Sequence, residues 1–148
     1  MADLPILFSA PMVLKFIEGQ KLPLTVTVQA VGKRSAQQNR LNRQWMLDIE
    51  AQLDGWTAEY ARGYCKLYFG IPILRNEDEE FCREYDAVVR PLSYEAKLKL
   101  MMVPFDFGVI RKMTVKQQAA YLDAINQHFS EQGVVLTNPD DLRFGRVA

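Results

Sequence analysis

The chain has 148 residues, and its 18 basic and 18 acidic side chains give a formal net charge of zero. The length fits one domain spanning residues 1–148, and a composition of 49% hydrophobic and 24% charged residues excludes a disordered or fibrous protein. Because the total charge is zero, any nucleic-acid site has to come from local clustering of basic side chains.

The amino-terminal residues lack the basic and apolar regions of a secretory signal, and no stretch approaches the roughly 18 apolar residues that cross a bilayer. The two cysteines, Cys65 and Cys82, form no CxxC pair and fit buried, reduced side chains better than a disulfide. We therefore expect a protein of the bacterial cytoplasm with no membrane contact.

Strand patterns occupy the amino-terminal part of the chain. Residues 6–8 form a short apolar run, and in residues 22–31 Leu24, Val26 and Val28 alternate with polar residues at the period of a half-buried strand. Residues 134–136 are a second short apolar run, which could return to this sheet or dock on a neighbouring element. These segments predict an α+β fold, in which a small amino-terminal β-sheet packs with about four helices.

The clearest helix signal begins at Ser35, which can form a capping box with Gln38. An apolar stripe follows at four-residue spacing and ends before Gly55; its members are Leu41, Trp45, Ile49 and Leu53. Thr57 is a candidate N-cap for a second helix, which we expect to run to about residue 69 and to be stopped by Gly70 and Pro72. The short connection predicts that the two helices form a hairpin.

Three further helices are predicted from their first residues. An acidic run at residues 77–80 suits the positive end of a helix dipole, and Ser93 is a candidate N-cap. Thr114 and Gln117 form a second capping box, and Gly133 is placed to end that last helix in the left-handed conformation.

The residues offer little for catalysis. The single histidine, His128, has no acid or thiol at a useful spacing, and there is neither a phosphate-binding loop nor a Cys/His zinc set. We therefore expect no catalytic residue, no metal, no cofactor and no enzymatic activity. One alternative stays open, a metal-dependent, structure-selective DNA nuclease or resolvase that uses acids such as Asp48, Glu50 and Asp54.

The stronger signal is a basic segment without acids. Residues 33–43 contain four cations interleaved with amide side chains that can bond sugars or base edges, and the candidate contacts are Lys33, Arg34, Gln38, Asn39, Arg40 and Arg43. A helix amino terminus and arginines that grip two oxygens at once suit a phosphate. This pattern favours binding to a nucleic-acid backbone, although a plain solvated helix face would carry similar residues.

The second predicted helix mixes rings and cations, with Tyr60, Arg62 and Lys66 as candidate contacts. Single-strand binders use this mixture, because bases stack on rings while cations follow the backbone. Residues that alternate in sequence do not share one helix face, so some of these rings belong to the core. Trp45 lies on the apolar stripe of the first helix, and its ring either fills the core or stacks on a base.

The segment around these candidates resembles the signature of the NinB (Orf) family of lambdoid phage recombination proteins, which includes prophage YbcN-like members. The matching positions are Arg34, Ser35, Gln38, Asn39 and Trp45. The strand pattern after Pro23, the segment from Trp56, the capping box with the helix around Tyr121, and the tail from Gly133 are also similar to that family.

The resemblance implies a homodimer that binds single-stranded DNA with little sequence preference. It also implies a recombination mediator, which helps a recombinase to load where host single-strand-binding protein is bound. A second alternative is a protein–protein adaptor of phage recombination, with Phe105 and Phe107 as anchors in the loop that follows Pro104.

Overall fold

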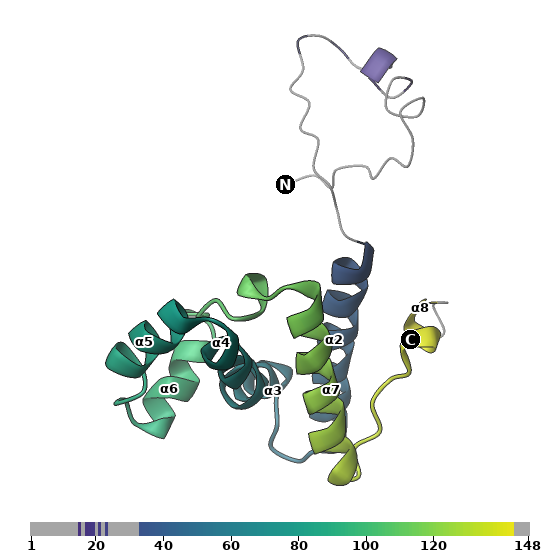
Figure 1. Ribbon diagram of the computed structural model, residues 1–148. Coiled ribbons are helices and arrows are strands. Elements are labelled where there is room, and N and C mark those ends of the chain that lie inside the picture. Colours follow the sequence, from purple (N-terminus) through teal and green to yellow (C-terminus); the bar gives the residue numbers. More distant parts are fainter. Residues whose placement is uncertain (1–14, 16, 20, 22, 24–32, 144–148) are drawn as a thin grey trace. The chain divides into compact units, whose positions relative to one another are not determined.

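The computed structural model describes residues 15, 17–19, 21, 23 and 33–143. Contacts divide the chain into two compact units, Met1–Ala30 and Val31–Ala148, and the second unit carries nearly all of the described residues. Figure 1 shows this unit as an assembly of helices, and no strand occurs among the residues described in it.

The predicted α+β fold is therefore wrong for the described part of the chain, which is mostly helical and contains no sheet. Most of the predicted strand residues, 6–8 and 22–31, lie outside the described residues. The other short apolar run, residues 134–136, is described, and it docks on the helix α2 instead. Gln52 donates to the Val135 carbonyl at 2.7 Å and accepts from its N–H at 2.8 Å, as a neighbouring strand would.

The helices of the second unit follow one another with short connections. In chain order they are α2 (Lys33–Gln52), α3 (Ala58–Cys65), the π-helical turn η1 (Lys66–Gly70), α4 (Ile71–Glu77), α5 (Glu79–Val88), α6 (Tyr94–Met101), the 3-10 turn η2 (Ile110–Lys112), α7 (Val115–Glu131) and α8 (Pro139–Arg143). No helix in the described ranges is long and apolar enough to cross a bilayer.

Four of the predicted caps are confirmed. The Thr57, Ser93 and Thr114 hydroxyls each accept from the backbone N–H three residues later, and Gln117 completes the capping box at the start of α7. Gly133 follows α7 with a φ of 84°, the left-handed conformation that glycine adopts without steric cost. The capping box at Ser35 is wrong, because α2 begins two residues earlier and Ser35 lies inside it.

The sequence predicted that Gly70 and Pro72 would stop the second helix, and this prediction is wrong. Proline lacks the N–H that would continue the usual ladder, and here the chain widens into η1, in which the Ile71 N–H bonds the Lys66 carbonyl five residues back. A Cβ on Gly70 would lie 2.5 Å from Val109, so this glycine permits close packing rather than a break.

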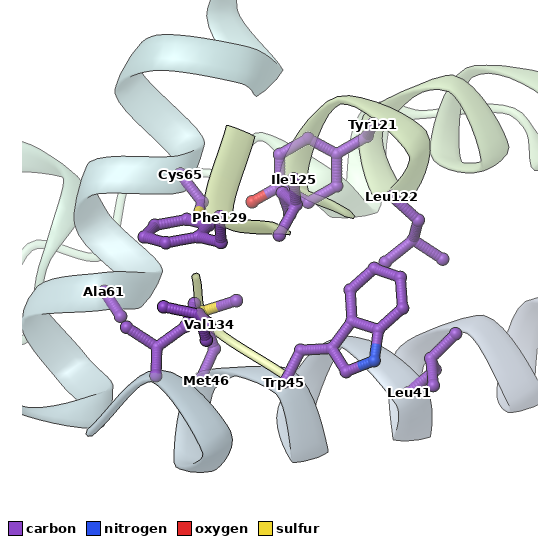
Figure 2. Close-up of a cluster of buried hydrophobic side chains, with 11 residues drawn as sticks. Leu41, Trp45, Met46, Ala61, Cys65, Tyr121, Leu122, Ile125, Phe129 and Val134 are labelled. Atoms are coloured by element: carbon purple, nitrogen blue, oxygen red, sulfur yellow. The ribbon is translucent and has the colours of Figure 1, made fainter. Parts of the chain in front are cut away.

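Two hydrophobic clusters hold the unit together. The first joins α2, α3 and α7, and it is drawn in Figure 2; its largest members are Trp45, Met46, Ile49, Tyr121, Ile125 and Phe129. The second joins α4, α5 and the end of α6 to Val109, with Ile71, Leu74 and Tyr85 among its buried members. The partly buried Met113 packs against both clusters.

Candidate nucleic-acid interface

The amino-terminal halves of α2 and α7 lie side by side, although they are far apart in the sequence. Gln38 donates to the Val115 carbonyl at 3.2 Å, and the buried Gln118 donates to the side-chain oxygen of Asn39. The two helices therefore run parallel, as Figure 1 shows for the blue α2 and the green α7. Their dipoles place both positive ends at the same end of the pair.

Both segments carry exposed cations, on α2 and in the stretch of chain that leads into and begins α7. We call this part of the helix pair the basic end and define it by five exposed side chains, Arg40, Arg43, Arg111, Lys112 and Lys116. Residues 33–47 and residues 107–122 contain no acidic side chain. One carboxylate reaches the start of α7 from outside these segments, since Glu77 accepts a hydrogen bond from Gln117.

Arg40 and Arg43 lie one turn apart on α2, opposite its buried stripe, where residues three apart share a face. Within the described ranges no carboxylate pairs with either guanidinium, because the ion pairs found there involve Arg62, Lys66, Arg75 and Arg90. Both side chains are exposed on the face opposite the stripe, as the sequence predicted, and their contact with a phosphate stays a prediction. Lys33 and Arg34 lie in the first turn of α2.

The side chains of Gln38 and Asn39 form hydrogen bonds within the protein. Their side chains bond to α7 through Val115 and Gln118, so they help to bring the two basic segments together. In the described part of the chain, the buried side-chain oxygens of Gln38 and of Asn42 have no hydrogen-bond partner. We therefore read Gln38 and Asn39 as residues that position the basic end.

Trp45 belongs to the core and is not a stacking platform. Its side chain is 6% exposed, and its indole N–H donates to the Thr137 carbonyl at 2.8 Å. Figure 2 shows the ring on the side of α2 that faces Leu122 and Ile125 of α7. Trp45 therefore fills the core as part of the apolar stripe of α2, and its prediction as a DNA contact is wrong.

Arg62 and Lys66 are not free to bind DNA, because both pair with carboxylates of the protein. Arg62 pairs with Glu59 at 2.8 Å and with Asp106 at 2.7 Å. The Lys66 side chain is 3% exposed and donates to Asp106 at 2.8 Å and to the Met101 carbonyl at 2.7 Å. These bonds clamp the loop that follows α6 onto α3 and η1, and we call the four side chains Glu59, Arg62, Lys66 and Asp106 the loop clamp.

The pKa values of the loop clamp follow from this geometry. The hydrogen bonds from Lys66 and then Arg62 lower the pKa of Asp106 to about 2. The hydrogen bond from Arg62 is also the main cause that lowers the pKa of Glu59. Burial lowers the pKa of Lys66, and its bond to Asp106 opposes that change. The two cations of the loop clamp are therefore neutralised by its two carboxylates, which leaves little attraction for an outside phosphate.

Tyr60 is half-buried in a row of rings that begins inside the protein. Trp56 packs edge-on against Tyr60, with ring centroids 4.7 Å apart. The row continues to Tyr64 and Tyr68, and the centroids of these two rings are 4.4 Å apart. Of these four rings only Tyr68 is exposed, at 45%. Trp56 and Tyr64 pack against the first cluster, so the end of the row at Tyr68 is the part that a ligand could reach.

The acids and anchors of the alternative functions do not converge. Asp48 accepts from the Thr137 N–H at 2.7 Å, and Glu50 caps α3 by accepting from the Ala58 N–H at 2.5 Å. The described residues contain no group of three His, Cys, Asp or Glu side chains that could hold a metal. Phe107 packs against Phe81 and Tyr85, whereas Phe105 is 67% exposed.

Two further observations concern residues that the sequence singled out. His128 is half-buried and contacts the Tyr64 hydroxyl at 3.3 Å and the Gln132 amide at 2.7 Å. Cys65 and Cys82 are both free thiols, and burial raises the pKa of Cys65.

The sequence interpretation missed Arg111, Lys112 and Lys116. Their signal resembled that of α2, a run without acids that contains several cations at the start of a helix, and here Thr114 caps that helix. What the sequence lacked was the pairing of the two runs, which depends on hydrogen bonds between residues 77 and 79 positions apart.

The chain matches no protein-family model, no curated protein and no solved structure. The similarity to the NinB family therefore stays a prediction that rests mainly on residues 34–45.

Proposed function

We propose that this protein binds single-stranded DNA and that the basic end is its main contact with the phosphate backbone. The observation that carries the proposal is the meeting of two acid-free basic segments, on α2 and before and within α7, at the same end of a parallel helix pair. Arg40 and Arg43 supply guanidinium groups without a carboxylate partner in the described ranges. The two helix dipoles add to the same positive field.

The wider role is that of a recombination mediator, which helps a recombinase to load against host single-strand-binding protein. This part of the proposal is supported by the similarity of residues 34–45 to the NinB signature, and the same similarity favours a homodimer. A pull-down of host single-strand-binding protein, with and without an oligonucleotide, tests the partnership. Sedimentation of the free protein tests the homodimer.

The binding test compares fluorescent single-stranded and duplex oligonucleotides of mixed sequence, at low salt and without metal. We expect the wild-type protein to prefer the single strand. The double variant Arg40→Ala with Arg43→Ala should bind at least on the order of 100-fold more weakly, because it loses two charged hydrogen bonds of about 1.5–3 kcal/mol each.

A matched control removes two exposed cations away from the basic end, Arg83 on α5 and Lys99 on α6. The double variant Arg83→Ala with Lys99→Ala has the same net charge as the test variant. It should keep nearly full affinity. Equal losses in both double variants would mean that total charge, and not the basic end, determines binding, and the site assignment would then be wrong.

A further inference from the structure

A cavity of about 260 Å³ opens between the segment formed by η1 and α4 and the helices α5 and α6. Leu67, Ile71 and Pro72 give it an apolar lining. Three rings and three cations complete that lining, namely Tyr68, Tyr85, Tyr94, Arg75, Arg90 and Lys97. None of the lining residues is acidic, so the cavity favours a ligand that joins a flat apolar group to an anion.

The cations around the cavity are only partly neutralised. Arg75 donates to both carboxylate oxygens of Asp86, at 2.7 and 2.8 Å, and Arg90 approaches the same carboxylate at 3.4 Å. Lys97 has no ion-pair partner in the part of the chain that the structure describes. Arg75 and Arg90 therefore share one carboxylate, and Lys97 and the 65% exposed Arg90 are the two cations that an outside anion can reach.

Two of the three rings of the cavity, Tyr68 and Tyr94, are exposed to solvent, whereas Tyr85 is buried. Tyr68 and Tyr94 are 45% and 40% exposed, and their ring centroids lie 6.2 Å apart. Tyr64 packs against Tyr68 and links it to the buried end of the aromatic row. Rings held in this way are suited to stacking with a base, which uses the π-face of the base and tolerates any sequence.

We propose that this cavity binds one nucleotide, with the base against Tyr68 and Tyr94 and the phosphate on Lys97 and Arg90. The volume lies just below the range of about 300–1,000 Å³ for ordinary ligand pockets, which suits a single base rather than a large cofactor. The lining has no Asn or Gln side chain to read adenine, and its cations, which could read guanine, are assigned to Asp86 and to the phosphate, so binding discriminates little among bases.

The nucleotide can be part of a single strand or a free mononucleotide, since both carry a base beside a phosphate. As a strand site the cavity deepens the proposed function, on which that reading rests. It adds a base contact on α6 and η1 to the phosphate contacts of the basic end. The mononucleotide reading needs no contribution from Arg40 or Arg43.

The first experiment titrates the full chain with thymidine 5′-monophosphate and follows the ring signals of Tyr68 and Tyr94 by NMR. We expect saturable shifts at millimolar nucleotide, and weaker binding of thymidine or inorganic phosphate alone. Lys97→Ala should reduce the affinity for the nucleotide several-fold. Lys99→Ala, which removes an exposed cation of the same helix outside the cavity, should not change it.

The second experiment compares an intact short oligonucleotide with one that contains abasic positions. The wild-type protein should lose about tenfold in affinity when a stacked base is missing. Tyr94→Leu should abolish that difference while the salt dependence of binding persists. Lys97→Ala gives an independent test if the tyrosine variant does not fold.

The outcomes separate the two proposals. A nucleotide response without any difference between intact and abasic strands assigns the cavity to a free nucleotide. A difference between the strands, lost in Tyr94→Leu, assigns it to the strand. If neither ring responds to the nucleotide and abasic strands bind as well as intact ones, the cavity proposal is overturned, whatever the Arg40 and Arg43 variants show.

Discussion

The basic side chains of α2 and those of α3 and η1 look alike in the sequence but have different surroundings in the fold. Arg40 and Arg43 are exposed and have no carboxylate partner in the described ranges, whereas Arg62 and Lys66 are held by Glu59 and Asp106. The difference comes from a loop about 40 residues further along the chain, which brings Asp106 against the second pair. A basic side chain therefore indicates a site for an outside anion only when no carboxylate of the protein already pairs with it.

The energetics of the two regions differ for the same reason. A solvated arginine keeps its hydration until a ligand arrives, and its removal changes stability by about 0.5 kcal/mol or less. Lys66 is buried, so its charge depends on Asp106 and the Met101 carbonyl for compensation. Substitutions in the loop clamp should thus affect folding, and substitutions at the basic end should affect binding.

The largest effect is expected on the buried face of α2, opposite its arginines. Trp45→Ala should lower the free energy of unfolding by about 3–5 kcal/mol, because a large core ring and its bond to Thr137 are both lost. Urea unfolding measures this loss. In a Trp56→Phe background, the emission of Trp45 should be unchanged when single-stranded DNA is added, and quenching by a stacked base would contradict its place in the core.

A smaller effect is expected in the loop clamp. Asp106→Asn leaves Lys66 buried without its anion, and we expect a loss of about 2 kcal/mol. This value is below the usual cost of breaking a buried pair because the Asp106 side chain is 50% exposed. The affinity for single-stranded DNA, measured under conditions in which the variant is folded, should match that of the wild type. A large loss of affinity would return Arg62 and Lys66 to the binding site.

The pH dependence of stability sharpens the same point. Lys66 and Arg62 lower the pKa of Asp106 to about 2 in the folded protein, against about 3.9 in an unfolded chain. A lowered folded-state pKa stabilises the protein above the unfolded value, and that contribution disappears as the pH falls from about 4 to about 2. The difference in unfolding free energy between the wild type and Asp106→Asn should therefore narrow across this window. A constant difference would show that the charge of Asp106 is irrelevant.

Local signals in the sequence predicted local structure well. The caps at Thr57, Ser93 and Thr114 depend on one hydroxyl and a backbone N–H three residues away, so they can be recognised without knowledge of the fold. The left-handed residue at Gly133 is of the same kind. Leu41, Trp45 and Ile49 were correctly predicted to share one face, and they are buried together in the first cluster.

Features that depend on distant partners were predicted poorly. Gly70 and Pro72 are strong helix breakers, but close packing against Val109 and a widened turn keep the chain helical there. The run at residues 134–136 has a strand pattern, yet the side chain of Gln52 supplies the hydrogen bonds that a sheet would have given. No local pattern indicates that Asp106 neutralises Lys66, or that α7 completes the basic end.

The salt dependence of single-strand binding tests the basic end most directly. For the wild type, the logarithm of the association constant should fall linearly with the logarithm of the salt concentration, with a slope of about −0.7 for each phosphate contacted. In the double variant Arg40→Ala with Arg43→Ala the slope should become shallower by about 1.4, which corresponds to two lost contacts. Parallel lines for the wild type and the double variant would contradict the assignment of these arginines to the phosphate backbone.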